Sequence, residues 1–335
     1  MLTIFTVPKA FKAHIGLIQL NAITSWSVLT PRPEIILFGD EEGTAELATE
    51  LGLRHIPDVS RNEYGTPLLN RVFEQAQDFS RYDTLCYINA DIILLSDFMR
   101  AVRQVSLWRP PYLMIGRRWN IDLAERIEFD CSDWEARLRA IVFQRSRPSD
   151  SYSVDYLVFT RGLFPEIPPF AVGRWWWDIW LVWKTLSQSV PVVDASTKVI
   201  AIHQNHQYDH IPEGPYNKEF KQNEKLAGGR RHSRTIEDAT HTLTACQNVI
   251  VIKPKSSFDM LFTSLRGAYQ RWSLRMNWNA PLSRSMNPLF PWFLWFAVLN
   301  ATQPSRHYLG LRRENLVRLL TRLRALGSFH WRSRN

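Results

Sequence analysis

Residues 83–95 read DTLCYINADIILL, and their pattern is the strongest indication of the fold. It opens as an apolar run of strand length, which is followed directly by the oxygen-bearing side chains of Asn89 and Asp91. Such a run is typical of a buried strand in a parallel sheet. Side chains two residues apart point to the same side of an extended chain. The stretch therefore predicts a buried strand whose carboxyl end presents two oxygen ligands together.

The residues upstream of this strand alternate between strand and helix patterns. Three extended apolar runs precede it, at residues 1–10, 34–43 and 54–56, and helical patterns separate them, at about 14–28, 44–51 and 67–79. In the last helix, Thr66 has the place of an N-cap and Pro67 that of the first helical residue. This alternation predicts an α/β domain with a mostly parallel sheet, whose ligands bind at the carboxyl ends of the strands.

Composition and absent motifs exclude several classes of protein. With 335 residues, 45% of them hydrophobic and 22% charged, the chain can bury a core as one large or two ordinary domains. Its three cysteines lie far apart, which excludes a disulfide scaffold and favours a cytoplasmic protein. The first residues lack the pattern of a signal peptide. No GxGxxG, GxxxxGK[ST], HExxH or GxSxG motif occurs, which argues against dehydrogenases, P-loop NTPases, zincins and serine hydrolases.

Asn89 and Asp91 could together hold a hard divalent cation, Mg²⁺ or Mn²⁺, which could neutralise a diphosphate. The structural alternative is that Asn89 forms a turn and Asp91 caps the next segment. Three histidines at 203, 206 and 210 follow the apolar run VIAI. One of them could be a metal ligand, with His203 the better placed and His206 the second choice, or all three could be structural.

Residues 171–180, AVGRWWWDIW, combine a carboxylate with four indole rings. Aromatic faces stack on sugar C–H surfaces, and a carboxylate desolvated by them gains a raised pKa suited to a general base. Asp178 is the candidate, with a helix N-cap as the alternative. Three adjacent tryptophans cannot all face the core of one helix, so at least one is expected to be exposed or to line a cleft.

Four segments in this order resemble the GT-A glycosyltransferases, of the nucleotide-diphospho-sugar transferase superfamily, and within it a bacterial and plant-like branch. They are TVP at 6–8, LFGD at 37–40, RNEYGTP at 61–67 and CYINADIILL at 86–95. The resemblance covers about residues 1–210. It departs from the family where the usual acidic motif, D-x-D, has Asn89 as its first member. An amide is the weaker ligand, so either metal affinity is lower than in the family, or Asp91 carries most of the metal binding.

The resemblance also implies roles for individual residues. The residues that it implies for donor binding lie at the strand ends and in the loops beside them. Thr6, Val7 and Pro8 would contact the base and ribose, with Asp40 nearby, and Arg61 would bind phosphate. Asn89 would help to hold the metal ion at the diphosphate, and Asp155 would contact the donor sugar. Asp91 and His203 are the expected metal ligands. Asp178 matches the family's base for the acceptor hydroxyl in an inverting reaction.

The last 81 residues differ in charge from the rest. Residues 255–335 contain thirteen Lys or Arg and two acidic residues, within a chain of formal net charge +9. The apolar run at 289–299 is too short to span a bilayer. Leucines recur at helical spacing among arginines over 311–329, which is typical of a helix on an anionic membrane surface. Packing on the domain and nucleic-acid binding are the alternatives, and no nucleic-acid motif supports the second.

The sequence therefore predicts an α/β protein with a GT-A Rossmann-like, mostly parallel sheet over residues 1–254 and a basic helical extension over 255–335. The predicted activity is that of a hexosyl- or pentosyltransferase that uses Mn²⁺ or Mg²⁺ and a nucleotide-diphosphate sugar. Its acceptor would be a glycan or lipid-linked hydroxyl at the cytoplasmic membrane, where residues 284–335 would bind. Two alternatives remain: a non-catalytic scaffold, and a sugar-nucleotide pyrophosphorylase, although the latter's Gly-rich loop after the first strand is missing.

Overall fold

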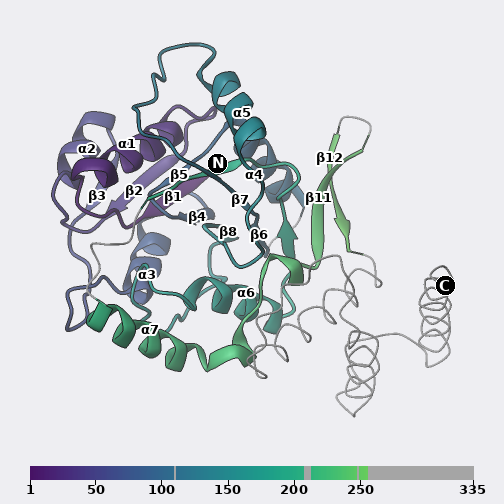
Figure 1. The fold of residues 1–335 in the computed structure, drawn as a ribbon. Coiled ribbons are helices and arrows are strands. Elements are labelled where there is room, and N and C mark those ends of the chain that lie inside the picture. The colour runs from purple at the N-terminus through teal and green to yellow at the C-terminus, as the bar shows by residue number, and fades with distance from the viewer. Residues whose placement is uncertain (109–110, 207–212, 247–248, 256–335) are drawn as a thin grey trace, which may run out of the picture. The chain divides into compact units, whose positions relative to one another are not determined.

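A computed structural model describes residues 1–108, 111–206, 213–246 and 249–255, all within one compact unit, Met1–Met260 (Figure 1). The expected extension over 255–335, its membrane-binding segment and the third histidine, His210, therefore lie outside the described residues, apart from Lys255. In the part of the chain that the structure describes, no helix has both the length and the apolar character needed to cross a membrane.

A nine-stranded sheet forms the centre of the described region, in the order β12-β11-β9-β6-β8-β4-β1-β2-β3. Strand β8 runs antiparallel to β4 and β6, β12 runs antiparallel to β11, and the other neighbours are parallel. The α/β fold with a mostly parallel sheet is thus confirmed. The strands are β1 (Thr3–Thr6), β2 (Glu34–Phe38), β3 (Arg54–Ile56), β4 (Thr84–Ile88), β6 (Leu113–Ile115), β8 (Tyr156–Thr160), β9 (Val192–Asp194), β11 (His241–Cys246) and β12 (Val249–Pro254).

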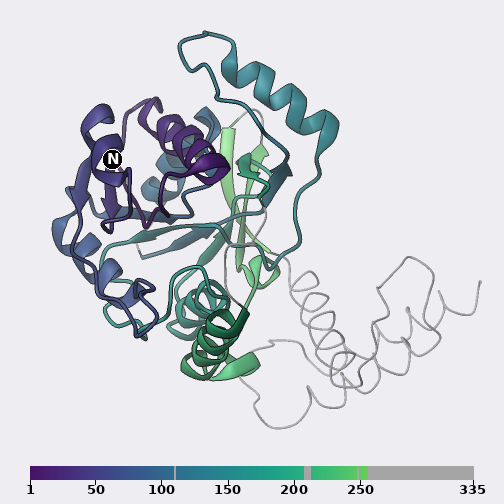
Figure 2. The ribbon, with the colours of Figure 1, turned by 60° about the vertical axis from the view of Figure 1, so that its left-hand side comes forward.

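Helices cover both faces of this sheet and bury a separate apolar core against each (Figures 1 and 2). The central strands are buried on both sides, as continuous apolar runs such as residues 35–38 of β2 require. On one face lie α1 (Ala13–Ser27), α2 (Thr44–Leu51), α4 (Ser96–Trp108) and α5 (Trp134–Arg145). On the other lie α3 (Leu69–Phe79), α6 (Trp177–Ser187) and α7 (Glu213–Ala227), and two short 3-10 helices follow, η1 (Gly229–His232) and η2 (Ile236–Asp238).

The connections of the first four strands create the place for a ligand. From β1 the chain passes through α1 to β2 and through α2 to β3, and then returns across the sheet to β4 on the other side of β1. Strand order therefore reverses between β1 and β4. In open α/β sheets, the crevice outside the carboxyl ends of two such strands is where ligands bind.

A small three-stranded sheet brings distant residues to the same edge. Strands β5 (Ile92–Ile93), β10 (Ala201–Gln204) and β7 (Arg118–Ile121) pair in the order β5-β10-β7. In the antiparallel pair of β5 and β10, His203 lies opposite Ile92, the residue that follows Asp91. Residues 83–95 thus contain two strands of different sheets, and residues 89–91 connect them.

One predicted boundary is wrong. Helix α3 begins at Leu69 with Leu68 as its N-cap, so Thr66 and Pro67 precede the helix instead of starting it. The cause is tertiary: the carbonyl of Pro67 accepts a hydrogen bond from the N–H of Val172 at 3.0 Å, and Leu68 forms a β-bridge with Ala171. This extended pairing holds residues 67–68 out of the helix and fixes the loop that opens α6.

Candidate functional site

A cavity of about 1360 Å³ lies at the carboxyl ends of β1 and β4. Its walls come chiefly from four segments that are distant in sequence. They are residues 7–10 after β1, residues 89–91 after β4, residues 150 and 152–155 before β8, and residues 172–175 and 177–178 at the start of α6. Strand topology alone predicts a ligand site at this edge, and the cavity occupies it.

Asp91, His203 and His206 form a cluster whose ligand atoms all lie within 4.8 Å of one another. The Oδ2 atom of Asp91 lies 3.1 Å from Nε2 of His206 and 3.5 Å from Nε2 of His203. Two polar atoms of the cluster, Oδ1 of Asp91 and Nδ1 of His203, are buried without a hydrogen-bond partner. Buried polar atoms normally find a partner, so these two are consistent with a ligand that completes the cluster.

The electrostatics of the cluster favour an ionised carboxylate. Burial disfavours the charged form of Asp91, but hydrogen bonds and charge from His203 and His206 outweigh burial and hold the pKa of Asp91 well below its usual range. A carboxylate with two imidazoles is an established donor set for divalent metal ions. These three side chains could therefore hold a divalent cation at the edge of the cavity, which Asp91 and His206 line. His206, the second choice among the histidines in the sequence analysis, joins His203 in this cluster.

Asn89 is oriented by Asp155, not by Asp91. Its side-chain amide donates to Oδ1 of Asp155 at 2.7 Å, and its backbone N–H donates to the carbonyl of Asp155 at 3.0 Å. Arg118 donates to both carboxylate oxygens of Asp155, at 2.9 and 3.0 Å. Burial raises the pKa of Asp155, and the charge of Arg118 acts in the opposite direction. Arg118, at the start of β7, was not foreseen, because nothing in the sequence distinguishes it from the adjacent Arg117.

Asp178 lies in the first turn of α6, where it lines the cavity among aromatic side chains. Next to it Trp177 is buried edge-on against Tyr87, with ring centroids 5.1 Å apart. Oδ1 of Asp178 accepts a hydrogen bond from the N–H of Ile179 at 2.9 Å. Burial nevertheless raises the pKa of Asp178 to about 7, with the charge of Asp155 adding to the shift. A carboxylate that is half ionised near neutral pH is suited to accept and release a proton.

The remaining predicted donor-binding residues divide into two groups. Val7 and Pro8 line the cavity, whereas Thr6 is buried in β1 with its hydroxyl unpartnered. Arg61 forms ion pairs with Asp40 and with Glu41, the latter at 2.9 Å, and neither Arg61 nor Asp40 is among the residues that line the cavity. Their roles at phosphate and ribose stay predictions.

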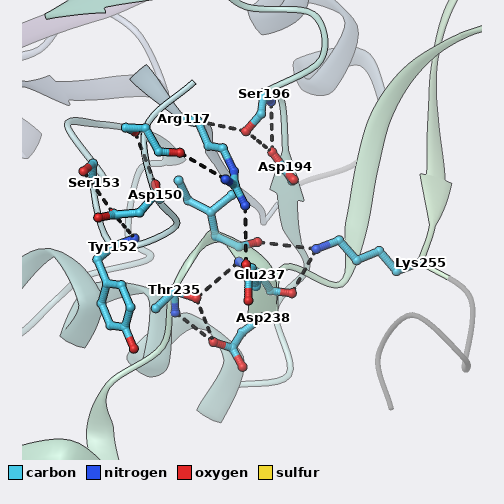
Figure 3. Close-up of polar contacts among 12 residues, drawn as sticks. Arg117, Asp150, Tyr152, Ser153, Asp194, Ser196, Thr235, Glu237, Asp238 and Lys255 are labelled. Atoms are coloured by element: carbon cyan, nitrogen blue, oxygen red, sulfur yellow. Dashed lines mark hydrogen bonds and ion pairs between the residues drawn. The ribbon is translucent and has the colours of Figure 1, made fainter. Parts of the chain in front are cut away.

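A polar network supports the segment before β8, which lines the cavity with residues 150 and 152–155 (Figure 3). Asp150 accepts hydrogen bonds from the N–H of Tyr152 at 2.9 Å and from the hydroxyl of Ser153 at 3.2 Å. Arg117 donates to the carbonyl of Ser149 at 3.0 Å and forms an ion pair at 3.5 Å with Glu237 of η2. The wall is thereby tied to a segment that lies much further along the chain.

No protein-family model matches the chain, and no curated protein is similar to it in sequence. Among solved structures, the chain is similar to glucosyl-3-phosphoglycerate synthase from Mycobacterium tuberculosis. The complex of that enzyme with Mn²⁺, uridine diphosphate and glucosyl-3-phosphoglycerate is 15% identical, with 76% of this chain and 87% of that chain covered and a TM-score of 0.41. Its complex with Mg²⁺ and uridine diphosphate is 13% identical over the same shares, with a TM-score of 0.40. TM-scores this low mark a loose likeness of backbones and assign no activity to this chain.

Proposed function

We propose that the chain is a glycosyltransferase of the GT-A type, which transfers a sugar from a nucleotide-diphosphate donor to an acceptor hydroxyl. One observation carries the proposal: a single cavity is lined by Asp91 and His206 of the candidate cation cluster and, separately, by a carboxylate whose pKa is raised to about 7, that of Asp178. The cavity lies where strand order reverses, and its volume of about 1360 Å³ is sufficient for a nucleotide sugar and part of an acceptor.

In this proposal, Asp91, His203 and His206 would hold Mn²⁺ or Mg²⁺. The ion would supply charge neutralisation for the departing nucleoside diphosphate. Lys9 lines the same cavity, and burial lowers its pKa while the charge of Asp91 acts in the opposite direction. Its ammonium group adds positive charge close to the cluster, where a diphosphate would bind.

Asp178 is the proposed base. It would accept the proton of the acceptor hydroxyl as the new bond to the anomeric carbon forms and the bond from that carbon to the diphosphate oxygen breaks. The products are the glycoside and the nucleoside diphosphate, with inverted configuration at the anomeric carbon. The raised pKa of Asp178 lets it take up this proton near neutral pH and release it afterwards.

The acceptor is proposed to be a glycan or a lipid-linked glycan. The basic sequence of residues 284–335 favours a reaction at the anionic, cytoplasmic face of a membrane. A flotation assay with phosphatidylglycerol vesicles, comparing the full chain with one ending at residue 260, would test this location.

Donor binding and slow donor hydrolysis test the activity itself. We would present UDP-, GDP-, dTDP- and CMP-sugars to the purified protein with Mn²⁺, beside an Asp91→Ala variant of matched stability. The expected result is selective hydrolysis of one donor class that disappears in the variant. Folded protein that neither binds nor hydrolyses any donor would exclude the activity and leave a non-catalytic scaffold. Pyrophosphorylase activity would appear instead as formation of a nucleoside triphosphate when pyrophosphate is added.

A further inference from the structure

Trp175 is exposed at the cavity, although its two neighbouring tryptophans are buried. The exposed fraction is 59% for Trp175, against 8% for Trp176 and 5% for Trp177. Trp175 also lines the cavity that contains Asp178. Phe220 of α7 lies beside it, with ring centroids 6.4 Å apart, but more than half of the Trp175 surface stays open to solvent. An indole exposed to this extent gains little stabilisation from burial, and its open face is available to a ligand in the cavity that it lines.

A buried side chain of α7 holds the loop that carries Trp175. Asn223 of α7, which is 1% exposed, accepts a hydrogen bond from the N–H of Ala171 at 2.9 Å. Its amide group donates to the carbonyls of Ala171, Arg174 and Trp175, at 3.1, 3.1 and 3.2 Å. These bonds fix the backbone on both sides of the turn, including that of Trp175 itself.

A buried ion pair adds a second attachment. Arg174 donates to Oε2 of Glu219 at 2.7 Å, and the Glu219 side chain is fully buried. The other oxygen of Glu219 accepts from the side-chain amide of Asn62 at 2.7 Å. Breaking one partner of a buried, hydrogen-bonded charge pair is strongly unfavourable. Arg174 therefore anchors the loop immediately before Trp175 to α7 and to the loop of Asn62.

The backbone itself turns Trp175 away from its neighbours. Trp176 has φ of 92°, in a region that residues with a side chain seldom adopt, and helix α6 begins directly after it. Strain of this kind persists where the surrounding contacts fix the conformation, and it is frequent at ligand sites. The strained residue separates an outward Trp175 from an inward Trp177 within three positions of the chain.

We infer that Trp175 is the platform of an acceptor subsite for the ring of a saccharide; this inference rests on the proposed function. The face of an indole ring carries negative potential, and the polarised C–H groups of a sugar ring pack against it. A ring on Trp175 would lie close to Asp178, three residues further along the chain, which is the proposed base for an acceptor hydroxyl. Tyr64 and Asn217 line the same cavity and offer hydrogen-bonding groups to the remaining hydroxyls.

The polar surroundings of Trp175 favour a sugar over a lipid chain. Lys12, Arg174 and Asp178 line the cavity with it, and charged side chains of this kind suit the hydroxyl groups of a sugar better than an acyl chain. A nucleobase could also stack on an indole. However, the residues that follow β1, Val7 and Pro8, are the predicted base-binding segment, and stacking of the donor base on Trp175 would make donor affinity depend on this residue.

The test is saccharide binding by the full chain on a glycan array, with Mn²⁺ and UDP present. We would compare Trp175→Ala, Trp175→Leu and Trp175→Phe, with Phe143→Ala as a matched control. Phe143 is 54% exposed on α5 and does not line the cavity. Thermal unfolding would verify that each variant is folded. Donor affinity and donor hydrolysis would be measured for each protein in parallel.

We expect saccharide affinity to fall about tenfold or more in the Ala and Leu variants, and less than about threefold in the Phe variant, which retains an aromatic face. Phe143→Ala should bind as the wild type does. Donor affinity should stay within about twofold throughout. The subsite would be overturned if wild type and Trp175→Ala bound saccharide equally well. It would also be overturned if Trp175→Leu bound saccharide as tightly as Trp175→Phe.

Two further outcomes separate this inference from the proposed function. Weaker donor binding in Trp175→Ala, with saccharide binding unchanged, would overturn the subsite in favour of base stacking. Absence of donor hydrolysis in the wild type would overturn the transferase, whereas saccharide binding that depends on Trp175 would still establish the subsite. No saccharide binding by a wild type that hydrolyses donor would overturn the subsite alone.

Discussion

The two ends of the cavity surround their carboxylates in different ways. At the β4 end, Asp91 faces His203 and His206, and these partners lower its pKa. At the α6 end, Asp178 lies among aromatic side chains, and burial raises its pKa to about 7. A carboxylate held ionised is suited to a cation, and one held near neutrality is suited to proton transfer. Two acids that their surroundings drive apart in pKa are a recognised way to divide the work of one active site.

Asp91→Asn should have the largest effect. It removes the carboxylate of the cluster while keeping its size, so Mn²⁺ affinity and transfer should both fall. Since metal ions contribute several kcal/mol of charge stabilisation, and each 1.36 kcal/mol is tenfold in rate, we expect transfer to fall about 10⁴-fold. Isothermal titration with Mn²⁺ and a donor-hydrolysis assay would measure the two losses. Retained Mn²⁺ affinity would place the cation elsewhere.

Asp178→Asn should lower transfer by about 10³-fold, which lies within the usual contribution of a general base, and should leave Mn²⁺ affinity unchanged. The wild-type rate should rise with pH through about 7 and then level, because the base must be ionised. Loss of Mn²⁺ binding in this variant would contradict the separate roles of the two carboxylates, cation binding by Asp91 and proton transfer by Asp178.

The same substitution should change how stability depends on pH. Because the folded-state pKa of Asp178 lies above the unfolded value of 3.8, the folded protein holds this proton more tightly. Its contribution to stability is present below about pH 4 and is lost as the pH rises to about 7, in total a few kcal/mol. Asp178→Asn, being uncharged, should not lose this contribution. The melting temperature of the variant, relative to that of the wild type, should therefore be higher at pH 8 than at pH 5.

His206→Ala should have a smaller effect, and only on cation binding at the β4 end of the cavity. Two imidazoles beside one carboxylate suit a transition-metal ion better than Mg²⁺, which prefers oxygen ligands. We expect the variant to lose about 10- to 100-fold in Mn²⁺ affinity and to lose less in Mg²⁺ affinity, so that its preference for Mn²⁺ narrows. Titration with each ion measures this preference. His55→Ala, on the edge strand β3 and outside the cavity lining, is the matched control.

The sequence predicted those parts of the molecule that depend on local patterns. The helix over 44–51 and the strand over 54–56 have the predicted bounds, because apolar spacing and flanking glycines specify them within a few residues. Long-range pairing determined the rest. Arg61 pairs with Asp40 and Glu41, and residues 67–68 pair with residues 171–172, through contacts that no local pattern reveals.

The candidate site shows the same division. The polar ends of β1 and β4 were predicted to meet, because parallel strands place their carboxyl ends at one edge. The hydrogen-bond partner of Asn89 was not predicted, because Asp155 lies 66 residues away in the sequence. The antiparallel pairing of β4 and β8 brings the two residues together. Likewise, three adjacent tryptophans implied that one is exposed, but the anchoring by Asn223 that selects Trp175 depends on α7.

Asn89→Asp should have only a small effect on metal binding, and the resemblance and the structure disagree about this substitution. By resemblance it would restore a D-x-D motif and strengthen metal binding. The structure predicts otherwise, because the Asn89 amide donates to Asp155 at 2.7 Å, and a carboxylate there would face a second carboxylate. One of the two acids would have to take up a proton, or the hydrogen bond would be lost, at a cost of about 1–3 kcal/mol in stability. We expect Mn²⁺ affinity to change less than about threefold and unfolding to occur at lower denaturant, more so at pH 8 than at pH 5. A large gain in Mn²⁺ affinity without loss of stability would show that residue 89 acts with the cluster of Asp91, His203 and His206, and not with Asp155.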